Sequence, residues 1–101
     1  MPITSSLSSD GSELAIMVAG RFDFSSQQQF RQAYESIAVK PARYRIDMSA
    51  ANYLDKSALG MLLLLRDHAS GNAADVHIAN CSAEIRTTLQ RSNFERLFNI
   101  T

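Results

Sequence analysis

Ser57 is the side chain in this sequence whose type and position best suit a chemical modification. It lies where a segment ending in Asp55 meets an apolar stretch of helix length, residues 58–65. At the start of a helix, unpaired backbone N–H groups and the positive end of the helix dipole point outward. A phosphate on Ser57 would be stabilised there, and it would bring about 1.5 to 2 negative charges to a position beside Asp55. Phosphorylation at Ser57 is therefore predicted to recharge the surface and leave the fold intact.

The helix expected after Ser57 carries more apolar residues than one buried stripe requires. Three leucines are expected to face the core: Leu59, Leu62 and Leu63. Three other residues are expected to lie partly outside that stripe, with at least one at the surface: Met61, Leu64 and Leu65. An apolar patch beside a charge switch is typical of a regulated interface. The residues alone also allow a simpler interpretation, in which Ser57 only caps the helix and the C-terminal tail covers the extra leucines.

The remaining candidates for chemistry do not form a catalytic or metal-binding set. Cys81 has no second cysteine and no neighbouring base, and His68 and His77 are not at ligand spacing. Helix caps and turns explain three aspartates more simply: Asp23, Asp47 and Asp55. No phosphate-binding glycine loop and no nucleophile elbow around Ser57 is present. We therefore expect no metal, no cofactor and no enzymatic activity, with a small hydrolase using Cys81 or Ser57 as the catalytic alternative.

Composition excludes several classes of partner. The chain has 101 residues, with ten basic and ten acidic side chains, so its formal net charge is zero. Nothing in this balance favours nucleic acid or an anionic membrane surface. The longest apolar run, residues 61–65, is far shorter than the ~20 residues of a membrane-spanning helix, and no signal-peptide pattern is seen. We expect a single domain over residues 1–101, located in the cytoplasm.

The elements that position Ser57 follow from turn signals and periodicity. Residues 8–12 contain Asp-Gly and predict a hairpin turn before a strand at 14–19. Ser25 and Gln28 fit a capping box for a helix. Four residues at helical spacing form the apolar face of that helix: Phe30, Ala33, Tyr34 and Ile37. A strand at 44–48 and a loop at 52–55 are expected next.

The second half of the chain continues the alternation. A helix from about residue 56 or 57 to about 69 is expected to end near Gly71, followed by a strand at 76–79. Ser82 is predicted to cap a third helix, and residues 94–98 are predicted to dock as a last turn or short helix. An initial hairpin followed by parallel crossovers predicts an α/β fold, with a mixed sheet of four to five strands and three to four helices.

Four segments, in order along nearly the whole chain, resemble the STAS domain, the family of bacterial anti-sigma factor antagonists. They are residues 20–25, 45–49, 54–60 and 94–100. The third, Leu-Asp-Lys-Ser-Ala-Leu-Gly, is the most specific, because the family often has Asp-Ser-Ser-Gly/Ala-Leu-Gly there and its second serine is the phosphoacceptor. That serine corresponds to Ser57. Lys56 is the departure, and its ammonium is expected to offset part of the phosphate charge or to alter how a kinase reads the site. Residues 61–68 look especially like antagonists paired with secretion and biofilm regulators of proteobacteria.

The resemblance implies a function and a surface. Unphosphorylated protein would bind an anti-sigma factor or a switch-type Ser/Thr kinase, phosphorylation of Ser57 would release it, and a PP2C-type phosphatase would reverse the change. The expected partner interface has seven members: Asp23, Asp55, Lys56, Ala58, Met61, Leu64 and Leu65. The alternative is a non-phosphorylated STAS subunit of a larger assembly, such as a lipid-transport complex.

Overall fold

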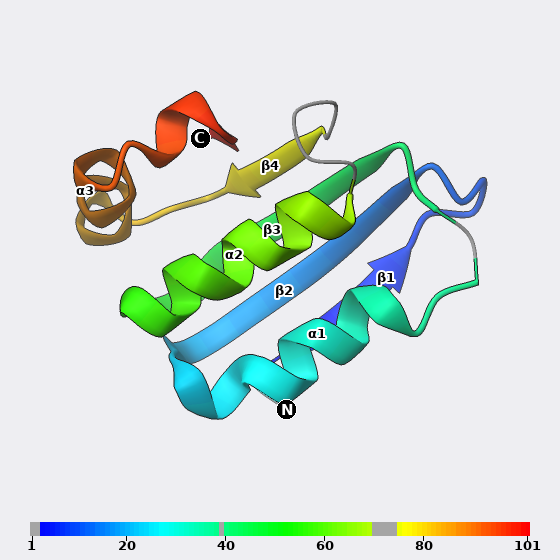
Figure 1. The fold of residues 1–101 in the computed structure, drawn as a ribbon, viewed down its shortest axis with the longest axis horizontal. Helices are drawn as coiled ribbons and strands as arrows, with labels where there is room; N and C mark the ends of the chain where they lie inside the picture. Colours follow the sequence, from blue (N-terminus) through cyan, green and yellow to red (C-terminus); the bar gives the residue numbers. More distant parts are fainter. Residues whose placement is uncertain (1–2, 39, 70–74) are drawn as a thin grey trace.

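A five-stranded sheet in the order β1-β2-β3-β4-β5 forms the framework of the computed structural model, which describes residues 3–38, 40–69 and 75–101. Helices α1 and α2 lie side by side across one face of the sheet, and α3 lies at one end (Figure 1). The elements are β1 (Ile3–Leu7), β2 (Glu13–Phe22), the 3-10 helix η1 (Phe24–Ser26), α1 (Gln27–Glu35), β3 (Arg43–Leu54), α2 (Lys56–His68), β4 (Val76–Ala79), α3 (Ala83–Arg91), the 3-10 helix η3 (Phe94–Arg96) and β5 (Asn99–Ile100).

The hairpin and the parallel crossovers are as predicted. β1 pairs antiparallel with β2, and each later pair of neighbouring strands is parallel. In the hairpin turn, the Asp10 carboxylate accepts hydrogen bonds from the Ser12 amide at 3.0 Å and from the Ser8 and Ser12 hydroxyls. Gly11 supplies the positive φ of 74° that this turn requires. The mixed α/β sheet expected from the sequence is therefore confirmed.

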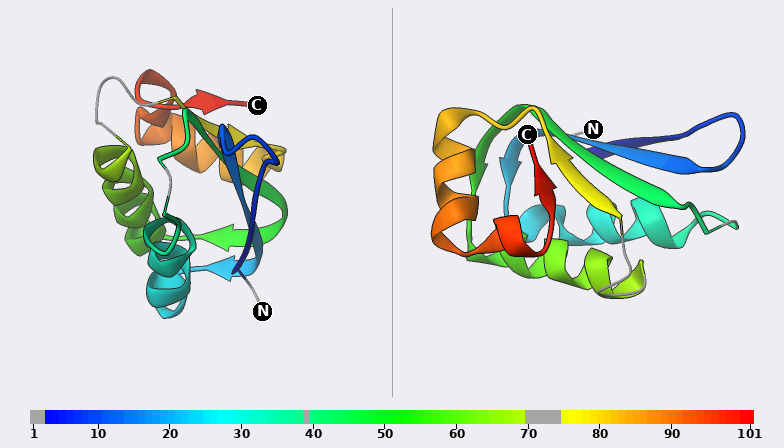
Figure 2. Two further views of the ribbon diagram at one scale, coloured as in Figure 1. Left: turned by 90° about the vertical axis from the view of Figure 1, so that its right-hand side faces the viewer. Right: turned by 90° about the horizontal axis from the view of Figure 1, so that it is seen from above.

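β3 is much longer than the strand predicted at 44–48. It continues through the expected loop to Leu54, because its second half pairs with the end of β2, from Ala19↔Ala50 to Phe22↔Leu54. β3 uses one residue more than β2 at two places along this ladder, which are β-bulges. The two strands bend together beyond them (Figure 2). This bend directs the end of β3 toward the start of α2.

Burial corrects the predicted inner face of α2. The side chains fully or almost fully buried are Ala58, Met61, Leu62 and Leu65. Of the three leucines predicted to face the core, only Leu62 is fully buried, whereas Leu59 is partly buried and Leu63 is 39% exposed. Five consecutive apolar residues in a helix leave several possible apolar faces, so the elements that pack against the helix decide which face is buried. Here α2 lies on the sheet beside α1, whose Phe30 and Tyr34 are buried as predicted.

The C-terminal region completes the core. Ser82 accepts a hydrogen bond from the Ile85 amide at 3.2 Å and caps α3, as predicted. The tail docks through η3, where the rings of Phe94 and Phe98 stack with centroids 5.3 Å apart. It then adds β5 beside β4, a fifth strand that no periodicity in residues 94–98 indicated. α2 ends at His68 with Ala69 as its C-cap, close to the predicted end at about residue 69, whereas Gly71, the predicted cap, lies outside the described residues.

Candidate functional site

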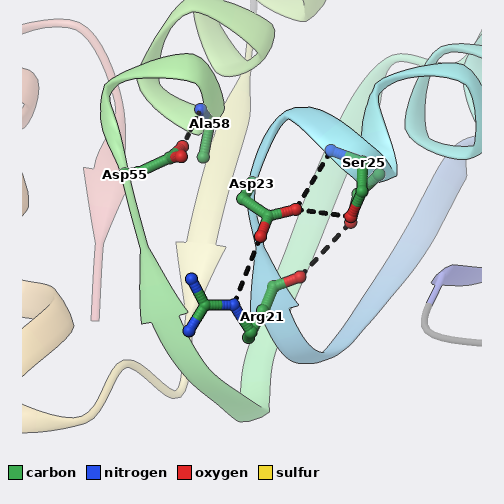
Figure 3. Close-up of polar contacts among 6 residues, drawn as sticks. Arg21, Asp23, Ser25, Asp55 and Ala58 are labelled. Carbon is green, nitrogen blue, oxygen red and sulfur yellow. Dashed lines mark hydrogen bonds and ion pairs between the residues drawn. The ribbon is translucent and has the colours of Figure 1, made fainter.

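Asp55 joins the end of β3 to the start of α2 and sets the position of Ser57. Its carboxylate accepts a hydrogen bond from the Ala58 amide at 3.0 Å, so Asp55 is the N-cap of α2 (Figure 3). Its own amide donates to the Phe22 carbonyl at 3.4 Å, which ties the cap to β2. Ser57, the second residue of α2, is exposed, and among the described residues its hydroxyl has no hydrogen-bond partner. The interpretation of Ser57 as the cap is therefore wrong, and its hydroxyl is available for chemistry.

Ser57 forms part of a mainly apolar hollow of about 390 Å³ between η1 and α2. The hollow, here called the Ser57 groove, is lined by Phe24, Gln27, Ser57, Gly60, Met61 and Leu64. Phe24 is 69% exposed and Leu64 is 53% exposed, far more than most large apolar side chains of the chain. No lining residue carries a formal charge. The site thus combines an unpaired hydroxyl with an uncharged apolar surface.

Asp23 organises the other wall of the site. Its carboxylate accepts hydrogen bonds from the Ser25 amide at 3.0 Å, the Ser25 hydroxyl, and Arg21 Nε at 3.3 Å (Figure 3). The Ser25 hydroxyl is the main cause of the lowered pKa of Asp23. The predicted capping box is therefore wrong, because Ser25 donates to Asp23 instead of closing a box with Gln28, and Asp23 caps η1. Asp23 was expected to act as a helix cap and as a member of the partner interface, and the cap was the simpler of these two roles.

The structure places the seven predicted interface residues in four groups. Lys56 and Leu64 are exposed, Asp23 and Asp55 are partly exposed, and Met61 lies in the wall of the Ser57 groove. Ala58 and Leu65 are 0% exposed, because they share the inner face of α2 with Leu62. Their assignment to the partner surface is wrong.

Three lining residues of the Ser57 groove were missed: Phe24, Gln27 and Gly60. Phe24 follows the cap Asp23, and an apolar residue directly after a cap was the available signal. Lys56 faces elsewhere, into a second hollow between α2 and α3.

The other candidates for chemistry stay apart. The rings of His68 and Tyr34 lie 4.9 Å apart, and His77 lies in β4. Cys81 is partly buried, and this burial raises the pKa of its thiol. Within residues 3–38, 40–69 and 75–101, no three metal-ligating side chains come together. In the same residues, no helix combines the length and apolarity needed to cross a membrane.

Comparisons with known proteins connect this geometry to one family. Residues 5–99 match the family model described as "Mlab, STAS domain". A STAS-domain containing protein of Pseudomonas aeruginosa is 57% identical over 101 residues, which is the full length of both chains. The unphosphorylated anti-sigma factor antagonist SpoIIAA superposes with a TM-score of 0.69 at 14% identity, covering 93% of this chain and 96% of that one. The phosphorylated form of the Bacillus cell fate determinant SpoIIAA gives a TM-score of 0.67 at 14% identity, covering 98% and 90%. At this identity the SpoIIAA structures show a shared fold.

Proposed function

Because this chain belongs to the STAS domain family, we propose that it is an anti-sigma factor antagonist controlled by phosphorylation of Ser57. The observation that carries the proposal is the unpaired, exposed hydroxyl of Ser57 in the wall of an uncharged apolar groove. In the unphosphorylated state, an anti-sigma factor or Ser/Thr kinase places apolar side chains against Phe24 and Leu64, the most exposed apolar residues of this groove. The antagonist itself performs no catalysis in this scheme.

Phosphorylation would convert this surface without refolding it. A partner kinase transfers the γ-phosphoryl group of ATP to Ser57 Oγ: the new O–P bond forms, the bond to ADP breaks, and a base on the kinase takes the hydroxyl proton. Ser57 is the second residue of α2, so the helix dipole favours the added charge, while the carboxylate of the N-cap Asp55 repels it. A partner that covered the groove would have to bury about 1.5 to 2 unpaired negative charges, which is unfavourable.

A PP2C-type phosphatase would restore binding. Water hydrolyses the phosphate ester, the O–P bond breaks, and the serine hydroxyl and inorganic phosphate are released. The magnesium, nucleotide and catalytic groups belong to the kinase and the phosphatase.

The test compares two Ser57 variants in pull-downs with the cognate anti-sigma factor. Ser57→Ala should bind as the unmodified protein does, and Ser57→Asp should bind about tenfold or more weakly, because a charge in the apolar groove loses its water on binding. Ser9→Asp, an exposed position in the β1–β2 turn, is the matched control for added charge and should bind normally. Equal binding by both Ser57 variants would sink the charge mechanism.

Intact-mass measurement of protein from its own host separates the proposal from the alternative. Phosphorylation adds a mass that phosphatase removes and that Ser57→Ala never acquires. An unmodified mass under every growth condition would favour the non-phosphorylated subunit of a larger assembly, which would use the same groove for permanent docking.

A further inference from the structure

A second groove lies on the other side of the α2 N-terminus, between α2 and α3. It has a volume of about 390 Å³, and the argument concerns five of its lining residues: Leu54, Lys56, Leu59, Thr88 and Arg91. Lys56 is the first residue of α2, and Arg91 is the last residue of α3. The start of α2 and the end of α3 therefore each place one cation in the same hollow, next to the end of β3. We call this hollow the α2–α3 groove.

The two cations in the α2–α3 groove are available to a ligand. Among the ion pairs within the described residues, four arginines have carboxylate partners: Arg21, Arg31, Arg43 and Arg45. In the part of the chain that the structure describes, Lys56 and Arg91 form no ion pair, and both are exposed. The groove also contains Asp55, whose carboxylate accepts a hydrogen bond from the Ala58 amide and keeps its negative charge. Two cations, Lys56 and Arg91, against this one carboxylate leave the groove a net charge of +1.

The groove continues along α3 and is longer than a small anion needs. A neighbouring hollow of about 200 Å³ shares Leu54 and Thr88 with it and ends at Glu84. Figure 2 shows α3 running beside the bent end of β3. The nine residues of α3 span about 13 Å, the length of about four extended residues. The partly buried Leu54 and Leu59 supply apolar contact in this seam.

We infer that the α2–α3 groove binds a short acidic segment of a protein partner, with its carboxylates at Lys56 and Arg91 and its apolar side chains on Leu54 and Leu59. Charge complementarity selects the acidic end, and the apolar contact and length favour a peptide over a free phosphate. Glu84, at the far end, disfavours a further carboxylate there and so sets the direction of the segment. This surface lies on the opposite side of α2 from the Ser57 groove and does not require phosphorylation.

The probe is a blocked pentapeptide of alternating leucine and aspartate, titrated into the ¹⁵N-labelled full chain and followed by NMR. Amide signals of Leu54, Leu59 and Thr88 should shift. Lys56→Gln and Arg91→Gln should each weaken binding roughly two- to fivefold, as expected for loss of one exposed ion pair. Arg86→Gln, an exposed cation on α3 outside these hollows, is the matched control and should bind normally.

Any of the following results would overturn the inference: binding of the asparagine version of the peptide as tight as that of the aspartate version, a loss of binding in Arg86→Gln as large as in Arg91→Gln, or shifts that map to Phe24 and Leu64. Concentration-dependent shifts at Thr88 without peptide would assign the groove to a second copy of the chain and would also refute it. Ser57→Asp should bind the peptide normally, so failure of the phosphorylation proposal and failure of this one are distinguishable.

Discussion

Lys56 and Ser57 are consecutive residues, yet they line different hollows on two sides of α2. Successive residues of an α-helix point about 100° apart, so adjacency in sequence separates their side chains around the axis. The sequence suggested that the Lys56 ammonium offsets a phosphate on Ser57. The structure places that ammonium in the α2–α3 groove, where Arg91 is its neighbouring cation. Variation at position 56 is therefore expected to act mainly on the α3 side.

Removing the cap of α2 should destabilise the chain. Asp55→Ala loses the hydrogen bond from the Ala58 amide and should lower the free energy of unfolding by about 1 kcal/mol. Asp55→Asn is the matched control, because asparagine caps helices as well as aspartate does. Urea unfolding measures both variants. Equal stability of Asp55→Ala and the wild type would show that the cap bond contributes nothing.

The observed buried face of α2 predicts that alanine substitution costs much more stability at Leu62 than at Leu64. Leu62 is 0% exposed, so Leu62→Ala should cost about 2 to 5 kcal/mol in the free energy of unfolding. Leu64 is 53% exposed, and Leu64→Ala should cost about 0.5 kcal/mol or less. The same substitution in one helix controls for propensity. Similar costs at both positions would contradict the observed rotation of α2.

Local signals predicted the elements well, and the misses have physical causes. The Asp-Gly turn, the Ser82 cap and the spacing of Phe30 and Tyr34 depend on neighbouring residues and were confirmed. The long second half of β3 depends on pairing with β2, which single-strand periodicity does not contain. β5 is a two-residue strand that exists only because β4 is beside it.

The candidate site shows the same division. A serine at the start of α2 could be predicted from the sequence, because Asp55 and the apolar run flank it. The opposite wall of the Ser57 groove could not be predicted, since Phe24 lies more than 30 residues earlier and reaches the groove only through the parallel crossover. The burial of Ala58 and Leu65 could not be predicted either, because an apolar run does not specify which face of the helix points inward.

The hairpin turn should respond to acid through Asp10. Hydrogen bonds from the Ser12 hydroxyl and amide, and from the Ser8 hydroxyl, lower the pKa of Asp10 to about 2 in the folded chain. Since this value is below that of the unfolded chain, the contribution to stability is present above pH of about 4 and is lost as pH falls through about 2. NMR titration of the Ser12 amide should give a midpoint near pH 2, and Asp10→Asn should abolish it. A midpoint near 4 would contradict these bonds.

Replacing Gly60 by alanine should stabilise the fold and weaken partner binding. It lies inside α2, is exposed, and has no atom within 4 Å of the position that a Cβ would occupy. Glycine in a helix interior costs about 0.5 to 1 kcal/mol relative to alanine, so Gly60→Ala should raise the free energy of unfolding by about that amount. Its new methyl group would enter the Ser57 groove between Ser57 and Leu64 and should weaken partner binding.

Gly20→Ala is the control for the Gly60→Ala variant. A Cβ at Gly20 also has no atom within 4 Å, but Gly20 has a φ of +73°, so Gly20→Ala should destabilise the chain by about 1 kcal/mol. Chemical denaturation and the partner pull-down together read out both effects, and a Gly60→Ala protein that binds normally would remove Gly60 from the interface.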